Sequence, residues 1–124
     1  MFVFDESALV ALFAAYVPVC RLWDRADRGK VVVGFPSAAM AEAGRRADIS
    51  PTAWDPLLWS VTVSVLPFGE EAAKQAGSWT GSLAAKHVIW ESRATGWPVL
   101  TCAPEQDGPG VRLLSVEFML SGVR

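Results

Sequence analysis

The 124-residue chain lacks most of the signals that would assign it to a common enzyme class. It contains no glycine-rich phosphate loop, no nucleophile elbow and no HExxH pattern, so dehydrogenase, P-loop and serine-hydrolase functions have little support. It has only two cysteines, Cys20 and Cys102, and they do not form a zinc-binding spacing. We therefore expect two reduced thiols rather than a metal site or a disulfide framework.

The chain also lacks an excess of positive charge. Its formal net charge is −2 and its isoelectric point is about 5.3. Proteins that bind nucleic acid by their overall charge carry clustered Lys and Arg, because these side chains neutralise phosphates. A stripe formed by Arg21, Arg25 and Arg28 is interleaved with Asp24 and Asp27, which is typical of a solvated helix face. Any contact with RNA must therefore be local.

No hydrophobic run is long enough for a membrane-spanning helix. The longest candidate, Ala8–Val17, is much shorter than the ~20 apolar residues that such a helix needs. Asp5 and Glu6 stand where a signal peptide would carry positive charges, and Pro18 interrupts the segment that follows. We therefore expect a cytoplasmic protein with no membrane association, folded as a single domain over residues 1–124.

What the chain has in abundance is apolar surface. Hydrophobic residues make up 52% of the sequence and six residues are Trp, which is more than one small core easily hides. Self-association or a partner chain is therefore a reasonable hypothesis. The tryptophans could stack on bases, but without basic neighbours they are expected to fill the core or an interface.

Strand-like and helix-like segments alternate along the chain. This order favours right-handed crossovers, a mainly parallel sheet of about five strands and helices on both faces, as in a three-layer α/β/α sandwich. The predicted strands are Met1–Phe4, Lys30–Phe35, Val61–Leu66, Pro98–Thr101 and Val111–Val116. The predicted helices are Ala8–Tyr16, Cys20–Arg28 ended by Gly29, one capped by Ser37, Glu70–Ala76, and one from Ser82 to Ala94 ended by Gly96. Residues 104–110 have the composition of a turn.

Ligands in parallel sheets bind at the carboxyl ends of the strands, and Asp5 follows the first apolar strand there. Four stretches, Phe2–Ser7, Val33–Glu42, Val65–Pro67 and Gly96–Thr101, occur in an order and spacing that span nearly the whole chain. Together they resemble the PIN-domain ribonucleases, the family of many bacterial toxin-antitoxin toxins.

The resemblance implies a site for Mg²⁺ or Mn²⁺. In that family four carboxylates converge to hold the metal, and hard divalent ions do prefer oxygen ligands. Asp5 matches the first family acid and Glu42 the second, with Ser7 and Thr101 as supporting hydroxyls. The positions of the third and fourth acids fall on Ala85 and Ala103, so half of the ligand set is missing.

Several alternatives remain open for these residues. Glu91, Glu105 or Asp107 could replace the missing acids, although acidic loop residues are usually only solvated. Asp5 and Glu42 could be capping or hydrogen-bonded carboxylates with no metal. His87, the only histidine, could be a general base, but a lone helix histidine is more often structural.

The family resemblance implies a metal-dependent endoribonuclease that cleaves single-stranded RNA, with activity weakened or lost because two acids are missing. It also implies an antitoxin-like protein as a partner. The alternative hypothesis is a non-catalytic PIN-fold interaction module that acts as a dimer or as one half of a complex, retained for its apolar surfaces.

Overall fold

The computed structural model describes residues 1–103 and 113–115 of the chain. Strands and helices alternate along it, as the sequence predicts. The elements are β1 (Phe2–Phe4), α1 (Glu6–Phe13), α2 (Val17–Arg28), β2 (Val33–Pro36), α3 (Ser37–Ala47), the 3₁₀ turn η1 (Pro51–Trp54), α4 (Asp55–Leu58), β3 (Val63–Leu66), α5 (Glu70–Ala76), α6 (Leu83–Thr95), β4 (Val99–Thr101) and β5 (Leu113–Ser115). The predicted turn at 104–110 lies outside the described residues.

The strands form one parallel sheet in the order β3-β2-β1-β4-β5. β1 to β4 belong to residues 1–103, and β5, formed by residues 113–115, pairs with β4. β2 and β4 are buried along their whole length, which agrees with the near-continuous apolar runs of parallel strands covered on both faces. The prediction of an α/β fold with a parallel sheet is confirmed.

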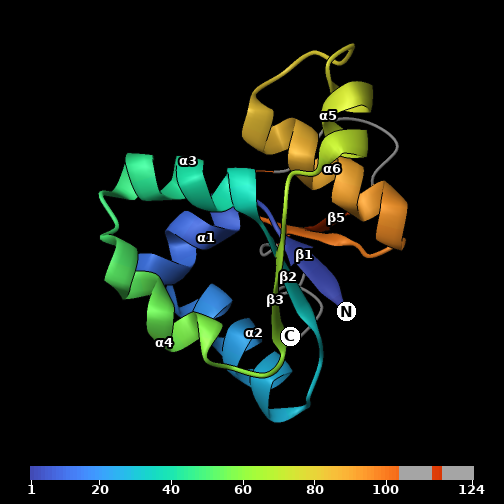
Figure 1. Ribbon diagram of the computed structural model, residues 1–124. Coiled ribbons are helices and arrows are strands. Elements are labelled where there is room, and N and C mark those ends of the chain that lie inside the picture. The colour runs from blue at the N-terminus through green and yellow to red at the C-terminus, as the bar shows by residue number, and fades with distance from the viewer. Residues whose placement is uncertain (104–112, 116–124) are drawn as a thin grey trace.

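Helices lie on both sides of the sheet. Figure 1 shows α1, α2 and α4 on one side and α5 and α6 on the other. α3 contacts α1 from the first group and α6 from the second, so it links the two helical layers. No single described helix is long and apolar enough to cross a membrane, although α1 and α2, bent by 98°, would reach that length and composition together.

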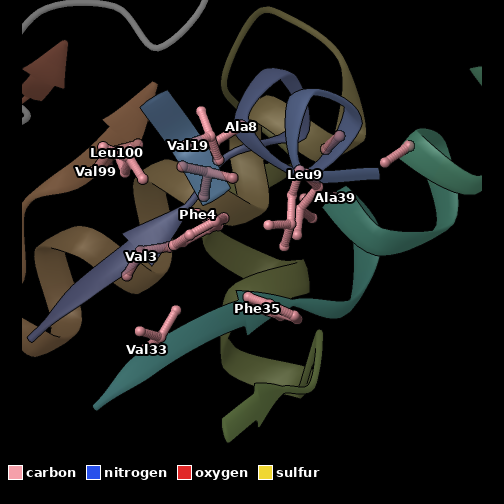
Figure 2. Close-up of a cluster of buried hydrophobic side chains, with 14 of the residues drawn as sticks. Val3, Phe4, Ala8, Leu9, Val19, Val33, Phe35, Ala39, Val99 and Leu100 are labelled. Atoms are coloured by element: carbon pink, nitrogen blue, oxygen red, sulfur yellow. The ribbon is translucent and has the colours of Figure 1, made fainter. Parts of the chain in front are cut away.

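The core is built from the strands and the inner faces of α1, α3 and α6. Figure 2 shows Phe4 and Phe35 on neighbouring strands, and their ring centroids are 5.3 Å apart. Trp54 and Trp23 pack their rings against Phe35. This confirms the expectation of a core position for Trp54, whereas Trp59 is 77% exposed and does not belong to the core.

Close packing favours glycine at one position of the sheet. A Cβ placed on Gly34, in the middle of β2, would lie 2.7 Å from Leu66 Cδ1 and also against the Trp97 ring. The absence of a side chain at Gly34 therefore lets Leu66 of the edge strand β3 and the Trp97 ring lie close to β2.

The helix ends show where the sequence signals were right. Asp5 and Ser82 are the N-caps of α1 and α6, and each side chain accepts a hydrogen bond from the amide three residues later. Gly96 ends α6 in the left-handed conformation with φ 74°, and Gly29 ends α2. Pro18 lies in the first turn of α2, where it needs no amide hydrogen bond.

The predicted cap at Ser37 is wrong. Pro36 is the N-cap residue of α3, and its side chain accepts no hydrogen bond from the first amides of the helix. The Ser37 hydroxyl instead accepts a hydrogen bond from the Phe68 amide at 3.1 Å, so it ties the segment after β3 to the start of α3. α1 also begins and ends earlier than predicted, since the chain turns through Ala15 at positive φ, and α2 begins at Val17 rather than at Cys20.

Candidate functional site

A cleft of about 320 Å³ opens at the carboxyl ends of the parallel strands. Parallel α/β sheets commonly bind ligands at this edge. Three carboxylate residues contribute to its wall, together with the start of α6. The residues that line it are Asp5, Glu6, Glu42, Gly81, Ser82, Ala85 and Val88.

Asp5 is the most deeply buried of these acids, at 2% exposure. Its Oδ1 accepts a hydrogen bond from the Ala8 amide at 2.8 Å and another from the Ser7 hydroxyl at 2.6 Å. Its Oδ2 is buried and has no hydrogen-bond partner among the residues that the structure describes. Oδ1 therefore caps α1, whereas Oδ2 is an unsatisfied hydrogen-bond acceptor among the described residues, which is energetically costly for a buried atom.

The two predicted hydroxyls do lie beside Asp5. Ser7 Oγ also accepts a hydrogen bond from the Cys102 amide at 2.9 Å and lies 3.3 Å from Thr101 Oγ1. Because Ser7 donates its only hydroxyl proton to Asp5, Thr101 must be the donor between the two hydroxyls. Thr101, fully buried, accepts in turn from the Ala103 amide at 2.9 Å. This network joins the ends of β1 and β4.

Glu42 lies in a more open environment on α3, with its side chain 33% exposed. Its Oε1 accepts hydrogen bonds from Nε of Arg45, at 2.9 Å, and from a terminal nitrogen of the same guanidinium. These hydrogen bonds lower the pKa of the Glu42 carboxyl below its ordinary value, so the group stays ionised in weak acid. A cation at Glu42 would have to compete with Arg45.

Glu6 is a member of the cleft that the sequence analysis missed. Its carboxylate is 15% exposed and lies 3.4 Å from the Arg46 guanidinium, in an ion pair between α1 and α3. Consecutive residues at a strand-to-helix junction point in different directions, and the sequence shows no partner for Glu6. Only the packing of α1 against α3 reveals that Asp5 and Glu6 share one cleft.

Ala85 lines the cleft from the first turn of α6. The position at which the PIN resemblance places the third acid is therefore occupied by a methyl group at the cleft wall. Ala103 lies two residues beyond β4, next to the Thr101 hydroxyl. Neither side chain can ligate a metal.

His87 and Glu91 lie outside this cleft. Glu91 Oε1 is 3.1 Å from His87 Nε2, so its carboxylate is engaged within α6. Glu105 and Asp107 lie outside the described residues. Among residues 1–103, no group of three or more His, Cys, Asp or Glu side chains is arranged to hold a metal ion. Of the acids that the sequence suggests as ligands, Asp5 and Glu42 are those that line the cleft, and Glu6 lies beside them.

The arginine stripe on α2 has local partners. Arg28 pairs with Asp24 at 3.1 Å on the surface. Asp27 accepts hydrogen bonds from Ser60 and Thr62, which lower the pKa of its carboxyl and join the end of α2 to the start of β3. The interpretation as a solvated helix face fits Arg28, while Asp27 has a structural role.

Comparisons of the chain with models of protein families and with curated proteins found no match.

Proposed function

We propose that the chain is a PIN-like protein related to metal-dependent endoribonuclease toxins, in which Asp5 and Glu42 bind one Mg²⁺ or Mn²⁺ ion weakly and ribonuclease activity is low or lost. The observation that supports this proposal best is the buried, unpartnered Oδ2 of Asp5 in an acidic cleft. A cation would satisfy this oxygen, and carboxylate oxygens are the ligands that hard divalent ions prefer.

The residues present fit one ion rather than two. Asp5 and Glu42 would hold it, with water molecules completing the coordination that Mg²⁺ demands. A bound ion would supply charge stabilisation and a more acidic water for phosphodiester hydrolysis. Arg45 and Arg46 neutralise the two glutamates, and Ala85 leaves the third wall without a charge. These features lower the expected affinity.

The chain's own residues prepare the site in the absence of an ion. The α1 N-terminus and Ser7 hold Oδ1 of Asp5, which keeps Oδ2 turned away from those donors. Thr101 fixes the Ser7 hydroxyl, so the rotamer of Asp5 is supported from two strands. The substrate class in this proposal, single-stranded RNA, is the one that the resemblance to the PIN-domain ribonucleases implies. The acidic chain would offer its phosphates only local contacts.

The test measures Mn²⁺ binding and RNA cleavage for the wild-type protein and for Asp5→Asn. The asparagine retains an oxygen for the Ala8 amide but removes the charge, so folding is preserved while binding falls. Asp24→Asn is the matched control, because it removes a surface acid on α2. Equal Mn²⁺ binding in the wild type and Asp5→Asn would contradict the proposal.

A gain-of-function variant sharpens this test. Ala85→Asp places a third carboxylate in the cleft wall, and the third residue of a helix tolerates an acid well because the helix dipole favours it. We expect Mn²⁺ affinity to rise about tenfold, since affinity follows the number of charged ligands. An unchanged affinity would show that the Ala85 side of the cleft does not face the ion.

The second candidate function is a non-catalytic module that pairs with a second copy of itself. β3 lies at one edge of the sheet, and Trp59, Val61 and Val65 around it are exposed at 77%, 88% and 42%. No charged residue occurs from Leu57 to Gly69, whereas edge strands are usually protected by charges. Val65→Lys should then reduce the mass in solution to that of a monomer, while Val17→Lys, at an exposed site on α2, should not.

A further inference from the structure

His87 is buried completely on α6, and the proposed site does not use it. Its ring contacts three parts of the chain. Nδ1 lies 3.2 Å from the Ala38 amide on α3, Nε2 lies 3.1 Å from Glu91, and the ring packs edge-on against Phe68 at 4.9 Å between centroids. A wholly buried histidine with two polar partners must hold a defined orientation.

The hydrogen bond from Ala38 fixes the protonation state of the ring. A backbone amide can only donate, so Nδ1 must be the unprotonated acceptor. The ring proton then resides on Nε2, which donates to the Glu91 carboxylate. His87 is therefore neutral in this arrangement.

His87 also supplies what the start of α3 lacks. The first amides of a helix have no partners within the helix and need acceptors. Pro36 provides no side-chain cap, and the Ser37 hydroxyl is occupied by the Phe68 amide. The Nδ1 of His87 reaches across from α6 and satisfies Ala38 instead.

We propose that neutral His87 is a positioning residue that fixes α3 against α6, and that protonating it releases the start of α3 and loosens the cleft formed by Asp5, Glu42 and Ala85. Glu42 lies four residues after Ala38 on the same helix, and Ala85 precedes His87 on α6. The hydrogen bond thus links the two helices that carry Glu42 and Ala85 to the cleft. Its effect on cation binding rests on the function proposed above; its effect on α3 does not.

Protonation of His87 Nδ1 would place two N–H donors, the ring and the Ala38 amide, against each other. With a proton on Nδ1, the ring would face the Ala38 amide and the positive end of α3, and the cap would be lost. Glu91 on the same helix is the charged group that acts on the ring, while α3 presents the Ala38 amide and the segment after β3 presents the Pro67 backbone and the Phe68 ring. Glu42 on α3 stays ionised in weak acid because of Arg45.

The direction of the pH effect follows from burial. Desolvation lowers the pKa of His87 below its ordinary value, against the opposing effects of Glu91 and the Pro67 backbone. The unfolded chain therefore binds a proton at His87 more readily than the folded chain. The stability that His87 contributes is fully present above pH of about 6.5, the pKa of the histidine in the unfolded chain. It declines as the pH falls toward the lower pKa of His87 in the folded chain.

The deciding experiment uses the metal-free protein. Amide hydrogen exchange at Ala38, corrected for the intrinsic rate, is measured from pH 7.5 to 5.5 in the wild type and in His87→Asn. Asparagine offers an oxygen near the Nδ1 position but does not titrate. We expect protection of Ala38 to fall about tenfold per pH unit once the ring protonates in the wild type, and to stay constant in the variant.

Two results would overturn the proposal. The first is wild-type protection of Ala38 that does not change with pH, or that changes equally in His87→Asn. The second comes from the ring itself and needs no variant: ¹⁵N signals that place a proton on Nδ1 at pH 7.5 would contradict the cap even if His87→Asn failed to fold.

A separate measurement distinguishes this proposal from the proposed function. Mn²⁺ affinity is followed over the same pH range in both proteins, and we expect a steeper decline in the wild type than in His87→Asn. Absence of Mn²⁺ binding at every pH would overturn the proposed function alone, since the exchange of Ala38 is measured without metal. Parallel declines would overturn the link between His87 and the cleft.

Discussion

The starts of α1 and α3 solve the same problem in two different ways. Each helix follows directly from a buried parallel strand, and each needs an acceptor for its first amides. At α1 the acceptor is Asp5, three residues before the amide that it binds. At α3 it is His87, 49 residues after the amide of Ala38. A local cap depends on the local sequence, whereas a distant cap forms only when α6 has docked.

The largest effect is expected at the distant cap. His87→Leu roughly keeps the volume of the side chain but removes the hydrogen-bond partner of the Ala38 amide and that of the Glu91 carboxylate, both in partly buried surroundings. We expect a loss of about 3 kcal/mol in the free energy of unfolding, because unsatisfied buried groups keep their full desolvation penalty. Urea unfolding at pH 7.5 measures it. A loss no larger than that of Asp5→Ala would remove the contrast between the two caps.

A smaller loss is expected at the local cap. Asp5→Ala removes the hydrogen bonds to Ala8 and Ser7 but also removes the unpartnered Oδ2. The net cost should be about 1 kcal/mol, the usual value for an N-cap, because relief of the buried oxygen offsets part of it. The same urea titration provides the measurement, with Asp5→Asn as the variant that retains the capping oxygen. A cost above that of His87→Leu would show that the local cap is dominant.

Ser37→Ala separates the predicted cap from the observed contact. The hydroxyl accepts from the Phe68 amide rather than from α3, so the variant should cost about 1 kcal/mol. Hydrogen exchange should change at Phe68 and remain unchanged at Ala38 and its neighbours in α3. Loss of protection at the start of α3 would restore Ser37 as the cap.

Arg45→Gln should have the smallest effect on stability and a visible effect on the cleft. The Arg45–Glu42 pair lies on the surface, where ion pairs contribute little to folding. Without the guanidinium, Glu42 is available to a cation, so we expect Mn²⁺ affinity to increase a few-fold and the melting temperature to change little. Arg28→Gln, which breaks a surface pair on α2, is the control. A decreased affinity would indicate that Arg45 supports Glu42 rather than competing for it.

The sequence predicted the strands and both ends of α5 and α6 because these follow from local rules. β-branched and aromatic runs marked β1, β2 and β3, and Ser82 and Gly96 marked the limits of α6 within one residue. The two hydroxyls expected beside Asp5 do lie next to it, since Ser7 is two residues away and Thr101 ends the neighbouring strand. Asp5, Glu42 and Ala85 line one cleft, which opens at the edge of the sheet where the parallel strands end.

Other features could not be read from the chain. The sequence does not indicate that Glu42 is held by Arg45, because an i,i+3 pair depends on rotamers that a competing partner could change. It does not bring Glu6 to the cleft, because that needs the contact between α1 and α3. It gives no reason to expect Trp59 at the surface beside an edge strand, because strand order decides which strand is at the edge.

Local signals thus determined the elements of this protein: apolar runs, capping residues and stop residues act over four or five positions, which is the range of a helical turn. Tertiary structure alone decided that one oxygen of Asp5 is buried without a partner among the described residues, and that His87 accepts a hydrogen bond from the start of α3. The physical reason is that burial and long-range hydrogen bonds depend on which elements pack together, and those contacts join residues far apart in the chain.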